Sequence, residues 1–479
     1  MTNSLAKGTF YLTFSSIIFL VSGYLINILL GRFLGPENYG LYGIVISLVT
    51  IINLAQNSGL PFTVSKYVSS ESDKEEAIYR TGFYLQIAST IFASILFFFL
   101  SGVIANLLKD PGLASYLQLA ALIFPFYGTF ALLTGYYNGL HKFGTQALLH
   151  ITYSILKIIT IIILAYYFRL FGVIIGFIIS PLIALLIKFH IPKRTNINFS
   201  YKKLIAFSIP LIGVAIFANV LQSIDLFFVK GITHSDKLAG FYTANQNVAE
   251  IPYFALTALA SVLFPSISKH ISQNLHHEAK KLISKSLRFS LLILIPGILL
   301  ISATSATLLT FLFSSAYLPG ATSLSILVIG SGFFTLFFIF VTIINSSGHP
   351  TKSSFLAGIG VIISSLLCLF LIPSFGLIGA ALATTIAAFI VMVGAAVIVY
   401  RKFGVLFSLK SSIKIITASL LIYFLAWIIV VPNLLLPLLY LFLFALYSGL
   451  LFLLKEITRE DIKMVSDMLP GWMKRKNNS

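Results

Sequence analysis

The chain has 479 residues, of which 58% are hydrophobic and 10% are charged, and its mean hydropathy is +0.99. Soluble domains carry about 25% charged residues, so too few polar side chains remain here to cover a water-facing surface, and the composition predicts an all-α integral membrane protein. The net charge of +18 would suggest a nucleic-acid partner in a soluble protein, but most of the basic residues lie in short gaps between apolar runs, where the positive-inside rule explains them.

A membrane-spanning helix needs about 20 mostly apolar residues. Fourteen such runs follow one another along the chain, and we therefore expect 14 transmembrane helices. The runs are 8–30, 40–59, 79–107, 113–138, 144–168, 171–189, 203–229, 239–268, 286–313, 320–346, 353–373, 376–400, 411–431 and 434–454.

The distribution of positive charge predicts the orientation. If the N-terminus is cytoplasmic, the inward loops and both tails hold 26 Lys and Arg, the outward loops hold five, and Lys157 alone lies inside a run. Cytoplasmic loops are enriched in Lys and Arg. We therefore expect both termini on the cytoplasmic side. The five outward residues are Arg32, Lys109, Arg169, Lys230 and Lys237.

Three short patterns of the first half return in the second half. Gly40-Leu41-Tyr42 matches Gly240-Phe241-Tyr242 at an offset of 200, His141 matches His349 at 208, and Gly172 matches Gly376 at 204. The offset covers six runs, an even number, so both copies would have the same orientation, as in a parallel repeat. The sequence thus predicts two parallel-repeat six-helix lobes plus two C-terminal helices.

The predicted domains follow from this repeat. We expect an N-terminal six-helix lobe at 1–190 and a C-terminal six-helix lobe at 203–402. A basic cytoplasmic linker at 191–202 joins them, and extra transmembrane helices 13 and 14 occupy 403–455. In the tail, 456–479, apolar residues recur at helical spacing and Pro470-Gly471 ends the pattern, which predicts an amphipathic helix on the inner leaflet.

The motifs "GRFLGPENYGLYG" after the first run, "DLFFVKGITHSDKLAGFYTA" after the seventh and "FGLIGAALATT" opening the twelfth resemble the polysaccharide-exporter branch of the multidrug/oligosaccharidyl-lipid/polysaccharide flippase superfamily. This resemblance covers nearly the whole chain. It implies two six-helix lobes around a water-filled cavity. It also implies transfer of a polyprenyl-diphosphate-linked oligosaccharide from the inner to the outer leaflet of the cytoplasmic membrane. We expect this transfer to proceed by alternating access, driven by an ion gradient or the membrane potential.

Polar side chains inside apolar runs are costly, so each is a candidate for transport. A diphosphate needs cations, and sugars need amides and aromatic rings. Acids inside spans are candidates for H⁺ or Na⁺ coupling, here Asp225 and Glu250. Each candidate also has a structural alternative, as an ion pair, a helix cap or an interhelical hydrogen bond. The predicted substrate-binding residues are Arg32, Gln56, Asn57, Arg80, Lys157, Gln222, Tyr242 and Asn245.

Two other functions are compatible with a membrane protein of this length. A cation-coupled multidrug or toxin exporter of the same superfamily is the alternative, but no acid lies within the first six runs. A membrane-embedded glycosyltransferase or polymerase would need a catalytic domain, and the longest inner loops have only about 20 residues. We therefore expect a transporter and no enzyme, with no catalytic residue, no metal and no cofactor, acting as a monomer. Its expected partners are the lipid-linked glycan, membrane lipids and other polysaccharide-assembly proteins, without nucleic acid.

Overall fold

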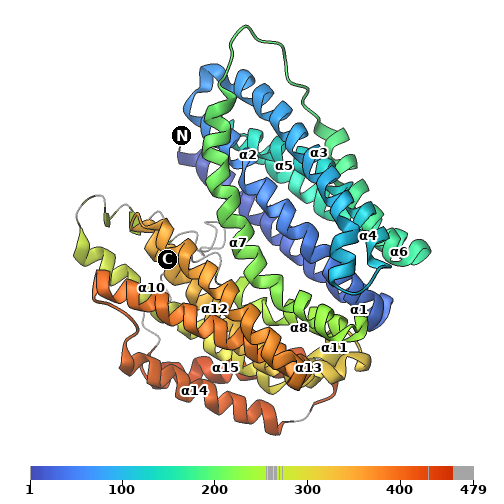
Figure 1. Cartoon of the computed structure of the whole chain (residues 1–479). Helices are drawn as coiled ribbons and strands as arrows, with labels where there is room; N and C mark the ends of the chain where they lie inside the picture. Colours follow the sequence, from blue (N-terminus) through green and yellow to red (C-terminus); the bar gives the residue numbers. More distant parts are fainter. Residues whose placement is uncertain are drawn as a thin grey trace, which may run out of the picture. The chain divides into compact units, whose positions relative to one another are not determined.

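The computed structural model describes residues 2–254, 275–429 and 431–456, with seven isolated positions between 255 and 274. Every secondary-structure element in these residues is a helix, which confirms the all-α class (Figure 1). The elements are α1 (Thr2–Ser58), α2 (Leu60–Ser70), η1 (Ser72–Lys74), α3 (Glu75–Leu107), α4 (Leu113–Ala120), α5 (Ile123–Gly139), α6 (Phe143–Lys188), α7 (Tyr201–Thr233), α8 (Asp236–Ala249), α10 (His276–Ala303), α11 (Ser305–Leu312), η2 (Ser315–Gly320), α12 (Ala321–Ser346), α13 (Pro350–Phe403), α14 (Leu409–Ile428), η3 (Asn433–Leu435) and α15 (Leu436–Leu453).

Ten segments of the described chain are long and apolar enough to cross a membrane. Three helices, α1, α6 and α13, contain a non-helical residue, at Gly35, Arg169 and Gly376. Each of these residues falls between two predicted runs or at the start of the second, so each of these helices covers two runs. The eighth run begins with α8 and continues into positions that are mostly outside the described residues. The total of 14 spans therefore stays a prediction.

The chain divides into two compact units, residues 1–244 and 245–479. In the first unit α1 packs against α6 and α7, and α5 packs against α2, α3 and α6. In the second unit α12 packs against α13, and α10 packs against α12 and α14. The α7 helix and the start of α8 thus belong to the first compact unit, whereas the six-helix lobes predicted from the repeat remain an expectation.

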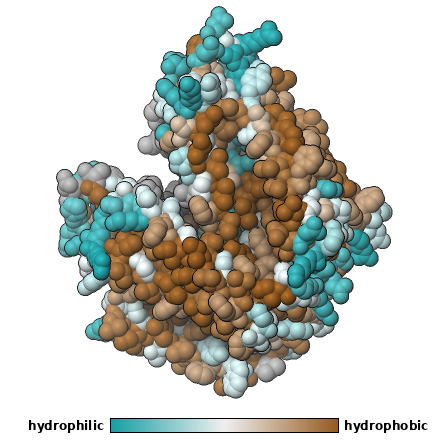
Figure 2. Space-filling view, in the orientation of Figure 1, coloured by the Kyte–Doolittle hydropathy of each residue, from teal (hydrophilic) through white to brown (hydrophobic). Residues whose placement is uncertain are grey.

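Large apolar side chains cover the outer faces of the helices (Figure 2). Phe99 on α3 is 74% exposed and Phe370 on α13 is 75% exposed. Exposed apolar area costs about 25 cal/mol per Å² in water, but it costs nothing against acyl chains. These faces are those of a multi-pass membrane protein.

The turn between α5 and α6 and the turn between α12 and α13 have the same construction. His141, with φ 56°, donates its backbone N–H to Asn138 O at 2.9 Å, and Gly348, with φ 84°, donates to Asn345 O at 3.0 Å. The structurally equivalent positions are 207 residues apart. The pairing of His141 with His349 is therefore wrong by one residue, because the shared feature is the left-handed backbone and not the imidazole.

The kinks in α6 and α13 are also 207 residues apart. Arg169 has φ 50° and ψ −130°, and Gly376 has φ 55° and ψ −129°. Three residues later, a Cβ on Gly172 would overlap the Leu164 carbonyl, and a Cβ on Gly379 would overlap that of Leu371. Gly172 therefore corresponds to Gly379, and its predicted pairing with Gly376 is wrong.

Gly40 and Gly240 lie where the second half of α1 contacts α8, inside the first unit. A Cβ on Gly240 would overlap the carbonyl oxygen of Pro36, and a Cβ on Gly40 would overlap that of Asp236. Only glycine allows this backbone approach. The two matching Gly-x-Tyr motifs thus recur because their helices pack directly on each other.

The linker between α6 and α7 is fixed to the ends of α3 and α5. Glu76 accepts the backbone N–H of Lys193 at 2.6 Å and lies 3.2 Å from His190 Nε2. Arg80 donates to the carbonyl oxygen of Thr195 at 3.1 Å. The segment has no helix of its own, so these side-chain contacts determine its path.

The last described residue, Glu456, holds the end of α15 against two other helices of the second unit. Its carboxylate lies 3.0 Å from Arg288 Nε of α10 and 3.4 Å from Lys414 Nζ of α14. The amphipathic helix predicted for the tail lies otherwise outside the described residues.

Candidate functional site

Lys157 lies in the interior of the first unit. Leu149, Tyr153, Lys157, Ile161 and Ala165 are all buried on α6, and their spacing of four places them along one inward face of the helix. Lys157 is 7% exposed. A cation at this position is therefore enclosed by the protein and does not extend to the lipid headgroups.

Aromatic rings surround this ammonium group. Lys157 Nζ lies 4.7 Å from the ring centroid of Phe19 on α1 and 5.6 Å from that of Tyr153 on α6. Such cation–π contacts stabilise a charge away from water. No hydrogen bond or ion pair of Lys157 occurs in the part of the chain that the structure describes. The lysine–aromatic cluster comprises Phe19, Tyr127, Phe130, His150, Tyr153 and Lys157.

Buried amides also lie inside the first unit, around Gly128 on α5. A Cβ on Gly128 would lie 2.9 Å from Gln86 Nε2 and 3.0 Å from Gln56 Oε1, so the missing side chain leaves room for both amides. Gln86 is 1% exposed. Its Nε2 and both polar atoms of the Gln56 side chain have no hydrogen-bond partner among the described residues. Buried amides are normally satisfied, so these three atoms are exceptional among the described residues.

Asp225 and Tyr242 are in direct contact. Tyr242 donates its hydroxyl hydrogen to Asp225 Oδ2 at 2.7 Å, and the backbone N–H of Leu226 donates to Asp225 Oδ1 at 2.9 Å. In the first copy of the repeat, Tyr42 donates to Asn27 Oδ1 at 3.2 Å. The same helix-to-helix bond thus ends on a neutral amide in one copy and on a carboxylate in the other.

The structure separates the remaining predicted residues. Arg80 donates hydrogen bonds to Thr195 and Asn198 of the linker between α6 and α7. Asn245 is fully buried and donates to Ser323 Oγ at 2.7 Å, within the second unit. Only Lys157 and Gln56 therefore fall in the polar interior just described, and a transport role for the others stays a prediction. The other predicted residues are exposed, Arg32 and Asn57, or partly buried, Gln222 and Glu250.

Two features of the first unit were missed from the sequence. Gln86 resembles any other amide in an apolar run, and only the tertiary structure shows that its Nε2 has no partner among the described residues. The sequence predicts Lys230 in an outward loop, but its side chain is 3% exposed and is paired with Asp110, at 2.7 Å, and with Asp236. The Lys-x₅-Asp spacing was the only local signal for the second of these pairs.

The lipid-facing outer surfaces and the buried polar groups of this helical chain are those of a multi-pass membrane protein. The chain belongs to the polysaccharide biosynthesis protein family, whose model matches residues 29–322. This family lies in the multidrug/oligosaccharidyl-lipid/polysaccharide flippase superfamily, as the sequence motifs indicated. The chain is accordingly a transporter and not an enzyme.

Curated relatives are consistent with this assignment. The chain is 27% identical over 375 residues to a Shigella flexneri protein described as an O-antigen transporter, with 74% of this chain and 88% of the relative covered. It is 27% identical over 176 residues to a Haloferax volcanii protein described as a low-salt glycan biosynthesis flippase, with 35% and 37% covered.

Solved structures share the fold. The lipid II flippase MurJ in an inward closed conformation matches with a TM-score of 0.77 at 17% identity, covering 92% of this chain and 97% of that one. An inward-facing multidrug resistance transporter of the MATE family matches with a TM-score of 0.68 at 13% identity, covering 81% and 94%.

Proposed function

We propose that this protein moves a polyprenyl-diphosphate-linked oligosaccharide, the repeat unit of a polysaccharide, from the inner to the outer leaflet of the cytoplasmic membrane. The observation that carries the proposal is the enclosed Lys157, which lies in the same compact unit as the unpaired buried amides of Gln56 and Gln86. An ammonium group stabilises a diphosphate through charge-assisted hydrogen bonds, Gln56 and Gln86 are suited to sugar hydroxyls, and aromatic rings suit sugar faces. The polyprenyl tail needs no polar partner and can stay in lipid.

The mechanism we infer is alternating access, in which the substrate enters from the inner leaflet and leaves to the outer one. A membrane potential of 100 mV supplies about 2.3 kcal/mol per charge moved, and Asp225 and Glu250 are the candidates for H⁺ or Na⁺ coupling. The alternative, a cation-coupled multidrug exporter, has less support, since the lysine–aromatic cluster contains no carboxylate.

Transport of a fluorescent polyprenyl-diphosphate-linked disaccharide in proteoliposomes tests the role of Lys157. A hydrogen bond to a charged group contributes about 1.5–3 kcal/mol, so Lys157→Met should slow flipping by about 10-fold to 100-fold, while Lys157→Arg should retain most of the rate. Flipping by Lys157→Met at the wild-type rate, with equal protein in the vesicles, would contradict the proposal.

Asp225→Asn tests whether Asp225 couples transport to an ion gradient, and the hydrogen bond between Tyr42 and Asn27 shows how an amide accepts at the matching position. The amide oxygen can still accept from Tyr242, as Asn27 accepts from Tyr42, so the variant should fold. It loses the charge and the second acceptor oxygen, which accepts the backbone N–H of Leu226. We expect flipping that no longer responds to an imposed proton or sodium gradient. If Asp225→Asn keeps the wild-type response to both gradients, Asp225 does not couple transport to either ion.

A further inference from the structure

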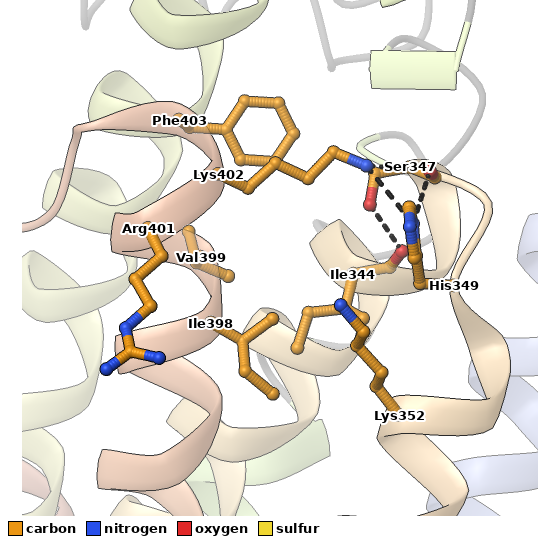
Figure 3. Close-up of a pocket in the computed structure, with 9 residues that line it drawn as sticks. All are labelled: Ile344, Ser347, His349, Lys352, Ile398, Val399, Arg401, Lys402 and Phe403. Carbon is orange, nitrogen blue, oxygen red and sulfur yellow. Dashed lines mark hydrogen bonds between the residues drawn. The ribbon is translucent and has the colours of Figure 1, made fainter.

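The second unit contains a basic pocket of about 470 Å³ (Figure 3). The end of α12 and both ends of α13 form it, because the kink at Gly376 returns the chain to the same side of the unit. Four of its nine lining residues are basic, His349, Lys352, Arg401 and Lys402, and none is acidic. Ile344 and Ile398 lie between the charged groups (Figure 3).

The charges of this pocket are only partly satisfied. Lys402 reaches across and donates to the carbonyl oxygen of Ser347 at 2.9 Å, while its Nζ lies 3.1 Å from His349 Nδ1. Lys352 and Arg401 flank the pocket (Figure 3), and neither has a hydrogen bond or ion pair with a residue that the structure describes. Like charges gathered without a carboxylate repel one another, so an anion in the pocket would lower the energy.

A further cation lies beside the pocket. Gly404 follows Phe403 of the lining, and Lys280 Nζ on α10 is 4.0 Å from the position that a Cβ on Gly404 would occupy. The local potential is therefore positive on more than one side, and the ligand has to be an anion.

The surface next to the pocket is apolar. Val397 and Ile390 precede Arg401 by four and eleven residues, so they share its face of α13, and each is 43% exposed. Phe355, three residues after Lys352, is 70% exposed. A molecule whose phosphate lies between Lys352 and Arg401 would thus have apolar side chains beside it for acyl chains.

We propose that this pocket binds the phosphate of an anionic glycerophospholipid, with the headgroup between Lys352 and Arg401 and the acyl chains along the exposed faces of α13. The site is separate from the lysine–aromatic cluster and serves a resident lipid. The position of the pocket along the helices fits this ligand, because the pocket forms at helix ends, and lipid headgroups lie at that level of the membrane.

Native mass spectrometry of the purified full chain in detergent tests the site, with phosphatidylglycerol and phosphatidylcholine of the same acyl chains as probes. Each cation near an anionic lipid contributes roughly fivefold in affinity, so Lys352→Gln with Arg401→Gln should weaken phosphatidylglycerol binding by about 25-fold. The control is Lys188→Gln with Arg194→Gln, which removes two exposed cations far from the pocket in sequence and should leave binding unchanged.

Equal binding of the two lipids, or equal loss in the control, would overturn the proposal. So would complete displacement of the lipid by equimolar inorganic phosphate, which would indicate a soluble anion site. Loss of polyprenyl diphosphate binding in Lys352→Gln with Arg401→Gln, with phosphatidylglycerol binding unchanged, would assign the pocket to the transported substrate instead. Arg401→Lys keeps the charge and should retain most of the binding, which separates lost charge from misfolding.

Discussion

At the residue scale, some buried polar atoms of the first unit have hydrogen-bond partners among the described residues and others have none. Thr63 Oγ1 and Ser208 Oγ lie 2.8 Å apart, and Thr63 also donates to Gly59 O, so these hydroxyls stabilise the packing. Gln86 is equally buried, but its Nε2 has no partner among the described residues. A buried amide nitrogen without a hydrogen-bond partner lowers the stability of the protein. A substrate that accepts a hydrogen bond from it would offset this cost.

We therefore expect Gln86→Leu to leave the thermal stability in detergent unchanged, or to raise the free energy of unfolding by about 1 kcal/mol or more, and still to slow flipping. Thr63→Val is the matched control, since it removes a hydroxyl that has partners and should destabilise the protein by about 1–3 kcal/mol. Thermal unfolding and the proteoliposome assay measure the two effects. A clear loss of stability in Gln86→Leu would give Gln86 a structural role.

At the element scale, the contact of α1 with α8 depends on two glycines that sequence comparison had already paired. The overlap of a Cβ on Gly240 would be with a backbone oxygen, so a rotamer change cannot relieve it. Gly102 on α3 has nothing within 4 Å of its missing side chain. The two positions therefore form a matched pair of glycines in helices, one packed and one open.

Gly240→Ala should lower the stability by about 1–3 kcal/mol, as over-packing does. Gly102→Ala should be neutral or stabilising by about 0.5–1 kcal/mol, because alanine restricts the unfolded chain. Melting temperatures of the two variants in one detergent measure the difference. Equal melting temperatures would mean that α1 and α8 do not pack through these backbones.

At the scale of the whole molecule, the charge distribution predicts that residue 194 lies on the cytoplasmic side and residue 237 on the outer side. Both side chains are exposed, and the native Cys368 is buried. A membrane-impermeant maleimide added to intact cells should therefore label Lys237→Cys and leave Arg194→Cys and the native chain unlabelled. Labelling of both variants from outside would contradict the orientation, and with it the expected direction of transport.

Much of this protein follows from the sequence alone. Apolar runs and the bias of Lys and Arg determine the membrane class, because lipid excludes unpaired backbone groups and most charges at any position. The same cost singles out Lys157 without knowledge of its neighbours. Gly40 and Gly240 were also found from the sequence, because a close backbone approach allows only one residue type.

Only the tertiary structure decided which polar groups are paired. Arg80 meets linker atoms more than 100 residues away. Gln86 differs from a paired amide such as Asn138 only because its Nε2 has no partner among the described residues. The repeat was misaligned at His141 and Gly172, since the two halves share backbone torsions at positions where the side chains differ. Pairing and torsion depend on neighbours distant in sequence, and those neighbours are brought together only when the helices pack.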